Sequence, residues 1–384
     1  MKVAHIFWSL TYGGIETMLV NIANGQAKMG AEVHVVIIND LYKEELLGQF
    51  GDKVTVHNLH RKYQSKGISF IFRLNSLLMK LQPDAIHLHD SRIYTFLWRK
   101  RLSRVASTTL HDLPTGSVRR GGLVGKLLPF LFKSSNVYYI DKVPRVFAIS
   151  DAVKDALWKR YGVHSTVVCN GILTRNFALR KEHMPNNPLR IVMVSRLEHN
   201  KKGQDLLIEA AVKLNGLVHV DFIGDGSSRG YLENMVKRLN AEEYVSFMGT
   251  KTQPYIAEHL CEYDLFVQPS RWEGFGLTVA EAMASNVPVL VSAGQGPAEV
   301  TCGEQYGWKF ENGNVEDLTS KINHIIEHYK KAMEKSNNAL NYVRNTYDVA
   351  VTARKYLSLY GLNQTCLLGA NHNVELENHW RAAA

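Results

Sequence analysis

The stretch that decides the fold runs from residue 189 to residue 224 and contains LRIVMVS (189–195), RLEHNKKG (196–203), QDLLIEAAVKL (204–214) and VHVDFIG (218–224). These segments have the patterns of a buried strand, a glycine-containing turn, an amphipathic helix and a second strand. Strands that are apolar at nearly every position are typical of parallel sheets, because helices cover both faces of such a sheet. The stretch therefore predicts the start of a doubly wound α/β unit.

The same succession occurs near the beginning of the chain. VAHIFWSL (3–10) leads through TYGG (11–14) to a helical pattern at 15–30 and a strand, EVHVVII (32–38). Further short apolar segments continue the alternation at 84–90, 145–150, 243–249, 264–270 and 287–293. The sequence thus predicts an α/β protein with two Rossmann-like, doubly wound domains.

A polar stretch, ALRKEHMPNNP (178–188), separates the two halves and contains two prolines. We place the interdomain linker there, which gives an N-terminal domain of residues 1–180 and a C-terminal domain of residues 188–345. A chain of 384 residues is long enough for two cores. A helical run is expected from Val315 to about Asn345, and the pattern leaves open which domain a final helix, near 347–362, joins.

The composition, with 45% hydrophobic and 21% charged residues, is that of a folded globular protein. The four cysteines lack zinc-finger spacing, which favours reduced thiols in a cytoplasm. The chain starts directly into a strand pattern, so no signal peptide is expected. Its apolar stretches fall short of the roughly 18 to 20 residues that a spanning helix requires. We therefore expect a cytoplasmic protein.

The formal charge of +9 is concentrated in residues 92–133, where basic side chains alternate with aromatic and aliphatic ones. The basic residues are Arg92, Arg99, Lys100, Arg101, Arg104, Arg119, Arg120, Lys126 and Lys133, against one acid, Asp112. This mixture predicts either contact with an anionic membrane surface, as a peripheral protein on the inner face, or a solvated basic face. No recognition motif accompanies the charge, so a nucleic-acid partner is not expected.

The segment with the most chemistry is FVQPSRWEGFGLTVAEAMASNVPVLVS (266–292). It predicts a strand, a loop with two glycines and a helix from about Leu277 to Ser285. The glycines allow close approach of a ligand, and the helix start offers free N–H groups to an anion. Glu273 lies on the loop, whereas Glu281 lies at the edge of the apolar helix stripe and needs a hydrogen-bonding partner. This separation disfavours a two-carboxylate hydrolase. The two glycines and the helix start suit a diphosphate that carries a sugar; the alternative is that Glu273 is a helix-entry acid and Glu281 a surface residue.

Cations and a second glycine turn follow the first strand of each half. Arg196, Lys201 and Lys202 come after the strand at 189–195, at the end where open α/β sheets bind ligands. Such cations neutralise a leaving diphosphate, although ordinary surface charge is the alternative for one of the two lysines. Gly13 and Gly14 precede the first helix, whose amides can also face a phosphate.

The histidines of the first half allow a structural or a functional interpretation. His111 ends a short strand-like segment and is either structural or directed into the cleft. His87 and His89 share one side of a strand, but no third metal ligand stands nearby in sequence. The chain also has no Asp-x-Asp pair to hold a divalent ion, so no metal and no other cofactor are predicted. GDGSSRG (224–230) is interpreted as a turn, because its last glycine comes one place late for a dinucleotide motif.

Together these segments resemble the retaining family 4 glycosyltransferases, which are group 1 glycosyltransferases with the GT-B fold. The resemblance is carried by GGIET (13–17), SRLEHNKKGQDLLIEA (195–210), FIGDG (222–226) and PSRWEGFGLTVAEAMASNVPVL (269–290), the last with the family's Glu-x7-Glu spacing. It covers nearly the whole chain. It implies two domains facing across a cleft and metal-independent transfer of a sugar from a nucleotide diphosphate, with the anomeric configuration kept.

The resemblance also implies roles for single residues. Glu273 matches the acid against the donor sugar, Glu281 the acid at the ribose hydroxyls, and His111 the cleft histidine beside the sugar. The remaining positions match donor-binding residues: Gly14, Arg196, Lys202, Gly274, Phe275, Gly276, Leu277 and Thr278. Lys201 rivals Lys202, because the spacing from Arg196 is one residue longer than in many members.

The resulting hypothesis is a glycosyltransferase of the hexosyltransferase type (EC 2.4). Its partners would be a nucleotide-sugar donor and, on the first domain, a glycan or lipid-linked acceptor in surface polysaccharide or glycolipid biosynthesis. One alternative is a sugar-nucleotide epimerase or hydrolase of the same fold, which needs no acceptor. A non-catalytic binding protein is the other, and an unchanged activity in Glu273→Ala would favour it.

Overall fold

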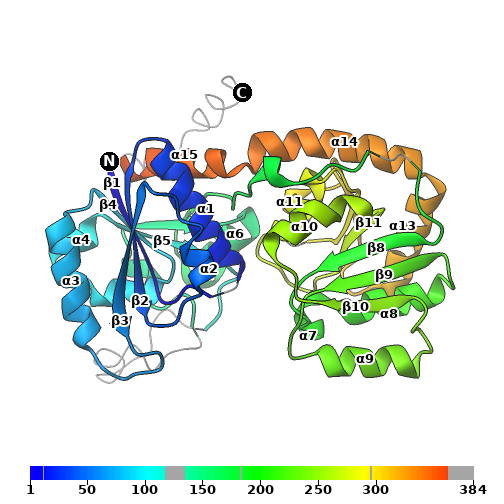
Figure 1. The fold of residues 1–384 in the computed structure, drawn as a ribbon, viewed down its shortest axis with the longest axis horizontal. Helices are drawn as coiled ribbons and strands as arrows, with labels where there is room; N and C mark the ends of the chain where they lie inside the picture. The colour runs from blue at the N-terminus through cyan, green and yellow to red at the C-terminus, as the bar shows by residue number, and fades with distance from the viewer. Residues whose placement is uncertain (12, 117–134, 182–183, 295, 362–384) are drawn as a thin grey trace. The chain divides into compact units, whose positions relative to one another are not determined.

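The computed structural model describes residues 1–11, 13–116, 135–181, 184–294 and 296–361. The chain forms two compact units (Figure 1). The first unit consists of Met1–Gly171 together with Val349–Ala384, and the second consists of Ile172–Asp348. The chain therefore passes into the second unit once and returns to the first unit for its last helix.

The first unit is built on a parallel sheet with the strand order β3-β2-β1-β4-β5-β6-β7. The strands are β1 (Lys2–Phe7), β2 (Glu32–Asn39), β3 (Val54–Arg61), β4 (Ala85–Leu88), β5 (Ala106–Leu110), β6 (Arg145–Ala148) and β7 (Thr166–Val167). The helices are α1 (Gly14–Lys28), α2 (Glu44–Leu47), α3 (Ser69–Leu81), α4 (Lys100–Arg104), α6 (Asp151–Tyr161) and α15 (Val349–Gly361).

The second unit repeats the plan with the strand order β10-β9-β8-β11-β12-β13. The strands are β8 (Leu189–Val194), β9 (Val218–Ile223), β10 (Val245–Gly249), β11 (Leu265–Gln268), β12 (Val289–Ser292) and β13 (Trp308–Phe310). The helices are α7 (His199–Lys202), α8 (Gln204–Lys213), α9 (Arg229–Arg238), α10 (Gln253–His259), α11 (Leu277–Ala284), α12 (Gly296–Val300), α13 (Val315–Glu327) and α14 (Tyr329–Thr346).

The two parallel sheets confirm the predicted fold class of two doubly wound α/β units. The central strands are buried along their length, as their continuous apolar sequence requires. Of the segment 224–230, interpreted as a turn, residues 224–228 connect β9 to α9, and Arg229 and Gly230 begin that helix. Gly224, at φ +138°, is needed there, because a Cβ atom would stand 2.0 Å from the carbonyl oxygen of Ser195.

The polar stretch at 178–188, predicted to be the linker, belongs to the second unit, and the division falls between residues 171 and 172 instead. Arg180 is buried and forms an ion pair of 2.5 Å with Asp264, which is also buried. The backbone amide of Asn186 donates to the same carboxylate at 3.2 Å. A buried ion pair between residues 84 positions apart leaves no local pattern, so the stretch resembles a linker in sequence.

The final helix, α15, packs on the first unit. Tyr356, Leu359 and Tyr360 of α15 share a core cluster with Met18 and Ile22 of α1. Gly25 of α1 allows the close contact, since a Cβ atom there would lie 3.1 Å from the Cβ of Ala353. The helical run predicted at 315–345 is two helices, α13 and α14, which meet at His328.

Each sheet has one place where successive connections leave in opposite directions. In the first unit it lies between β1 and β4, and in the second between β8 and β11. Loops diverge at such a switch point, and ligands of open α/β sheets commonly bind there, at the carboxyl ends of the two strands. A ligand site is therefore expected at the loops after these four strands.

Residues 117–134, which hold four of the nine basic residues predicted at 92–133, lie outside the described residues. In the part of the chain that the structure describes, no helix combines the length and apolarity needed to cross a membrane.

Candidate active site

Two loops of the second unit are tied together at the β8/β11 switch point. The guanidinium of Arg271 donates to both carboxylate oxygens of Asp205, at 2.8 and 2.7 Å. The amide of Arg271 also donates to the carbonyl oxygen of Lys201 at 2.9 Å. Gly203, at φ +73°, makes the approach possible, because a Cβ atom there would lie 2.1 Å from the carbonyl oxygen of Pro269. The loop after β8 is therefore held against the loop after β11.

This contact brings together two residues that the sequence singled out separately. Lys202 Nζ forms an ion pair and a hydrogen bond with Glu273 Oε2, and the two side chains are only 14% and 18% exposed. Lys201, the rival lysine, contributes the carbonyl contact to Arg271. Arg196 is different, because its side chain is 73% exposed and lies 3.4 Å from Glu198. Of the two lysines, Lys202 is therefore the one whose ammonium group faces Glu273.

Helix α11 begins next to this ion pair. Its N-cap, Gly276, has φ +102°, and no side chain caps the first amides. Phe275 is buried and packs edge-on against Tyr347, with ring centroids 5.4 Å apart, so its side chain anchors the loop. Thr278 donates from Oγ1 to Gln268 at 3.3 Å, and Leu277 is half-buried beside it. The helix start is thus fixed by packing and its amides are free of a side-chain cap.

Glu281 lies on α11 and is 8% exposed. Gln253 of α10 donates from Nε2 to Glu281 Oε1 at 2.8 Å, which supplies the partner that the helical pattern required. Burial raises the pKa of Glu281 to about 7, and the Gln253 hydrogen bond opposes this rise only in part. The sequence did not identify Gln253, because the two residues are 28 positions apart on different helices.

The first unit has a cavity of about 300 Å³ after strands β1, β4 and β5. Its lining includes Trp8, Glu16, Asp90 and His111. Asp90 accepts from the indole of Trp8 at 2.9 Å and pairs with Arg92. Gly14 is the exposed first residue of α1, behind β1. The structure thus places His111 in a cavity of the first unit and Gly14 at the start of α1, and their roles at a donor sugar stay predictions.

Buried histidines extend from this cavity into the sheet. His5 of β1, His89 after β4 and His111 after β5 are linked by ring-to-ring hydrogen bonds. The sequence singled out His87, His89 and His111 but missed His5, because only the pairing of β1 with β4 brings His5 beside them. Among the described residues, no group of three or more histidines, cysteines or carboxylates is arranged to hold a metal ion.

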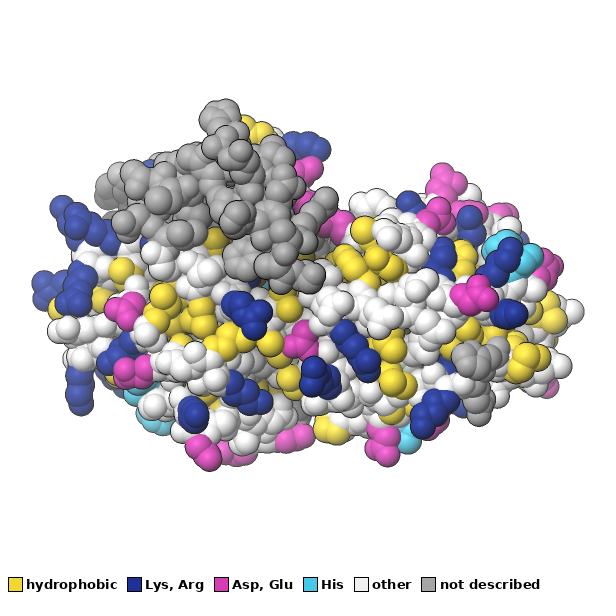
Figure 2. Space-filling view, turned by 90° about the horizontal axis from the view of Figure 1, so that it is seen from above, with side chains coloured by type: hydrophobic (Ala, Val, Ile, Leu, Met, Phe, Trp, Pro, Cys, Tyr) yellow, Lys and Arg dark blue, Asp and Glu magenta, His cyan; other side chains and the backbone are white. Residues whose placement is uncertain are grey.

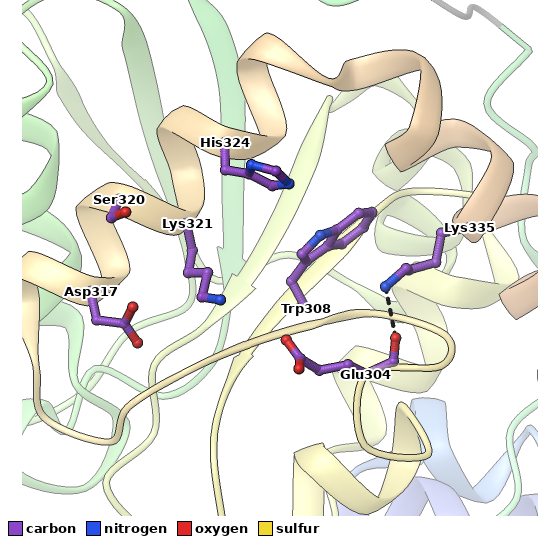
Figure 3. Close-up of a pocket in the computed structure, with 7 residues that line it drawn as sticks. All are labelled: Glu304, Trp308, Asp317, Ser320, Lys321, His324 and Lys335. Atoms are coloured by element: carbon purple, nitrogen blue, oxygen red, sulfur yellow. Dashed lines mark hydrogen bonds between the residues drawn. The ribbon is translucent and has the colours of Figure 1, made fainter.

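A second cavity, of about 430 Å³, lies among β13, α13 and α14. Figure 3 shows Trp308 between His324 and Lys335 in this cavity. The ammonium of Lys335 lies 4.4 Å from the Trp308 ring and donates to the carbonyl oxygen of Glu304 at 2.7 Å. None of the sequence-predicted site residues lines it, and the candidate functional groups are those at the switch point of each unit.

The chain matches two glycosyltransferase family models and resembles known glycosyltransferases. A model of the family described as "Glycosyl transferases group 1" matches residues 175–342, and one of "Glycosyltransferase Family 4" matches residues 12–175. Poly(ribitol-phosphate) α-N-acetylglucosaminyltransferase of Staphylococcus aureus is 27% identical over 60% of this chain, but the match spans only 47% of that relative. The phosphatidylinositol N-acetylglucosaminyltransferase GPI3 subunit of Saccharomyces cerevisiae is 23% identical over 91% of this chain and 79% of its own.

Solved structures have the same fold. HepE of Anabaena, in complex with UDP and glucose, superposes with a TM-score of 0.74 at 22% identity, over 94% of this chain and all of that one. Sucrose-phosphate synthase of Thermosynechococcus elongatus gives a TM-score of 0.74 at 17% identity, over 96% and 99% of the two chains.

The two sheets and these matches define the class: the family models together span residues 12–342, and the chain belongs to the group 1 glycosyltransferases, with the GT-B fold. The resemblance inferred from the sequence motifs is thereby confirmed.

Proposed function

We propose that this glycosyltransferase moves a sugar from a nucleotide diphosphate sugar to a glycan or lipid-linked acceptor, without a metal and with retention of the anomeric configuration. The observation that carries the proposal is the Lys202–Glu273 ion pair beside the uncapped start of α11. An ammonium group and free helix amides suit a diphosphate, and a carboxylate suits the hydroxyls of the attached sugar.

Donor binding would change the partners of this ion pair. The diphosphate would attract Lys202, and Glu273 would accept hydrogen bonds from sugar hydroxyls in its place. Both side chains are mostly buried, so their charges act in a low-dielectric environment where such interactions are strong. With Arg196 and the helix amides, Lys202 supplies countercharge for the leaving diphosphate, which is the basis for proposing metal independence.

In the proposed reaction the bond between the anomeric carbon and the diphosphate oxygen breaks, and a bond to the acceptor oxygen forms on the same face. The departing phosphate oxygen takes the proton of the acceptor hydroxyl. The transition state is oxocarbenium-like, and the protein contributes positioning and charge stabilisation. Glu273 would stabilise the positive charge that develops on the sugar ring.

The nature of the acceptor is supported by the relatives. Their names specify a poly(ribitol phosphate) and a phosphatidylinositol as the molecules that receive the sugar. Both are phosphate-containing components of cell surfaces or membranes. We therefore place this enzyme in surface polysaccharide or glycolipid biosynthesis, with the cavity of the first unit as the acceptor side.

The test is a donor screen followed by product analysis. Purified protein would be heated with UDP-, GDP- and dTDP-sugars, with and without EDTA, since a ligand of the folded state raises the melting temperature. The matching donor and a lipid-linked acceptor would then give a product whose anomeric configuration is read by NMR. We expect an unchanged configuration and full activity in EDTA. An inverted product, or activity restored only by a divalent metal, would contradict the proposal.

Three variants and an assay with donor alone test the donor site and the alternative functions. Lys202→Ala should weaken donor binding, whereas Lys201→Ala, at the neighbouring position, is the matched control and should bind normally. Nucleotide release from donor alone at the full rate would favour an epimerase or hydrolase. An unchanged rate in Glu273→Ala would favour a non-catalytic binding protein.

We also propose that the first unit contacts an anionic membrane surface. Phe72 of α3 and Trp98 before α4 are 58% and 52% exposed and pack edge-to-face, with ring centroids 4.6 Å apart. Arg99 and Lys100 follow Trp98 and are exposed. Figure 2 shows Lys and Arg side chains at the left edge of the first unit, the side on which Figure 1 places α3 and α4. Exposed aromatic rings beside cations suit the interface of an anionic bilayer.

Vesicle binding tests this surface. The double variant Arg99→Glu/Lys100→Glu should lose adsorption to phosphatidylserine vesicles in a flotation assay while keeping donor binding. Lys237→Glu/Arg238→Glu, on α9, makes the same charge change at another exposed pair and should still adsorb. Equal adsorption of both variants would refute the membrane proposal.

A further inference from the structure

A continuous row of hydrogen bonds leads from α1 to the cavity of the first unit. Gln26 Oε1 lies 2.8 Å from His5 Nε2, and His5 Nδ1 lies 3.1 Å from His89 Nε2. His89 Nδ1 lies 3.2 Å from His111 Nε2. Gln26 and His5 are completely buried, and His89 is 4% exposed. We call these four residues the histidine relay.

The relay has one direction, because each link needs one donor and one acceptor. An amide oxygen can only accept, so His5 must donate from Nε2. In a neutral imidazole the other nitrogen is then an acceptor, and His5 Nδ1 accepts from His89 Nε2. The same argument makes His111 donate from Nε2, so a lone pair is left on His111 Nδ1. The orientation of one side-chain amide therefore sets the tautomer of a ring three links away.

The argument requires that the rings are neutral. Burial lowers the pKa of His5 and of His111 to about 4 and that of His89 well below its usual value. Asp90, the acid that favours protonation of His111, is paired with Arg92. His87 stacks on His89, but its own nitrogens bond Tyr360 and Thr109, so it does not join the relay.

Each end of the relay carries a buried nitrogen that has no hydrogen-bond partner among the residues that the structure describes: Gln26 Nε2 at one end and His111 Nδ1 at the other. His111 lines the cavity of the first unit. A buried acceptor without a partner is costly, and a ligand that brings a hydroxyl group would remove this cost.

We propose that Gln26, His5 and His89 are positioning residues that hold His111 in its Nε2-protonated tautomer, so that His111 Nδ1 accepts a hydrogen bond from a hydroxyl group of a carbohydrate bound in this cavity. The carbohydrate part rests on the proposed function, whereas the tautomer does not. A fixed ring with a fixed lone pair discriminates a hydroxyl from a carbonyl or ether oxygen at that point, because only the hydroxyl can donate.

The direct test is the tautomer in the ligand-free protein. Protein labelled with 15N-histidine would be examined by long-range 15N–1H correlation spectroscopy, with signals assigned from single histidine variants. We expect His5, His89 and His111 to carry the proton on Nε2 and to stay neutral at pH 7. A proton on His111 Nδ1, or an even mixture of the two tautomers, would overturn the proposal.

The matched variants are Gln26→Met and Tyr356→Phe. Gln26→Met keeps the length of the side chain and removes the acceptor, so we expect a mixture of His111 tautomers. For the active enzyme, kcat/KM should fall roughly tenfold, the effect of one misdirected hydrogen bond. Tyr356→Phe removes a buried hydroxyl that bonds Thr109, outside the relay, and should keep the tautomer and the rate within about twofold.

The outcomes distinguish this inference from the proposed function. A single His111 tautomer in Gln26→Met would refute the role of Gln26, whatever the activity. Equal losses of activity in both variants would mean that general packing, not the relay, affects the rate. Nε2-protonated rings without binding of any sugar nucleotide would refute the proposed function and leave the tautomer assignment intact.

Discussion

The two switch points of this protein differ in how their polar groups are arranged. In the second unit, charges face each other across short loops: Lys202 pairs with Glu273, and Arg271 pairs with Asp205. In the first unit, neutral imidazole rings form a row inside the sheet. The same topology thus presents ion pairs that tie two loops together in one unit and, beside the Asp90–Arg92 ion pair, a directional row of hydrogen bonds in the other. A diphosphate needs countercharge, whereas a hydroxyl group needs an oriented acceptor, so the polar groups of the two units suit different parts of the proposed glycosyl transfer.

The largest effect on activity is expected when the carboxylate of Glu273, in the second unit, is removed. Glu273→Ala should lower kcat roughly 10²- to 10³-fold, the effect of losing one group that stabilises transition-state charge. His111→Ala should cost less, since it removes a neutral hydrogen bond. Steady-state kinetics with the selected donor would measure both. Trp272→Ala, at the exposed neighbouring position, is the control, and a larger loss in His111→Ala than in Glu273→Ala would reverse the assignment of roles.

The buried carboxyl group of Glu281 gives the next largest effect, on stability. Its pKa of about 7 in the folded protein lies above the ordinary value of 4.5. The folded state therefore binds the proton more tightly than the unfolded state does. The resulting contribution to the free energy of unfolding is complete below pH 4.5 and is lost as the pH rises through 7. Glu281→Gln is neutral at every pH. Between pH 4.5 and 8 the wild type should lose up to about 3 kcal/mol of unfolding free energy relative to this variant.

Urea denaturation of wild type and Glu281→Gln at pH 5, 6, 7 and 8 would measure this difference. The buried histidines titrate equally in both proteins and cancel. A difference in unfolding free energy that does not change with pH would show that Glu281 has an ordinary pKa. Glu281 would then be a charged carboxylate at neutral pH, like Glu273.

Donor binding should depend on the same group. Glu281→Ala should weaken binding by roughly 1 to 3 kcal/mol, the usual loss when a buried polar partner is removed. If the carboxylate accepts hydrogen bonds from the ribose hydroxyls, binding releases a proton, and wild-type affinity should rise about tenfold between pH 6 and pH 8. Calorimetry with the intact sugar nucleotide is decisive, because its diphosphate is a diester without a proton to lose in this range. Glu281→Gln should show a flat profile, and a flat wild-type profile would refute the ribose assignment.

Arg196 should give the smallest effect, because its side chain is mostly exposed and already lies near Glu198. Arg196→Ala should weaken donor binding about threefold in dilute buffer and less in 0.5 M salt, where exposed charges are screened. Lys202→Ala should cost more at both salt concentrations, because Lys202 is mostly buried. A salt-independent loss in Arg196→Ala would mean that Arg196 turns into the crevice when the donor binds.

Much of the second-unit site could be predicted from the sequence, because its parts are local. Glu273, the two loop glycines and Glu281 belong to one strand-loop-helix segment, and helical periodicity placed Glu281 at the edge of a buried stripe. Gln253 could not be predicted, because nothing in the spacing relates α10 to α11. The choice between Lys201 and Lys202 also depended on the tertiary structure, because Lys202 pairs with Glu273, 71 positions later in the chain.

The first-unit site was less predictable. The alternation in IHLHD placed His87 and His89 on one side of a strand, but His5 and Gln26 have no local signal that relates them to His111. The linker prediction was wrong for a similar reason, since Arg180 finds its partner, Asp264, 84 positions later in the chain.

The sequence by itself determined the class of fold, the two halves and the family, because strand hydrophobicity, helical periodicity and glycine turns are properties of neighbouring residues. Only the tertiary structure decided which polar groups meet: Lys202 with Glu273, Gln253 with Glu281, and Gln26 with His5, His89 and His111. Hydrogen bonds and ion pairs act over about 3 Å, and parallel strands with crossover helices bring such partners together from distant positions in the chain.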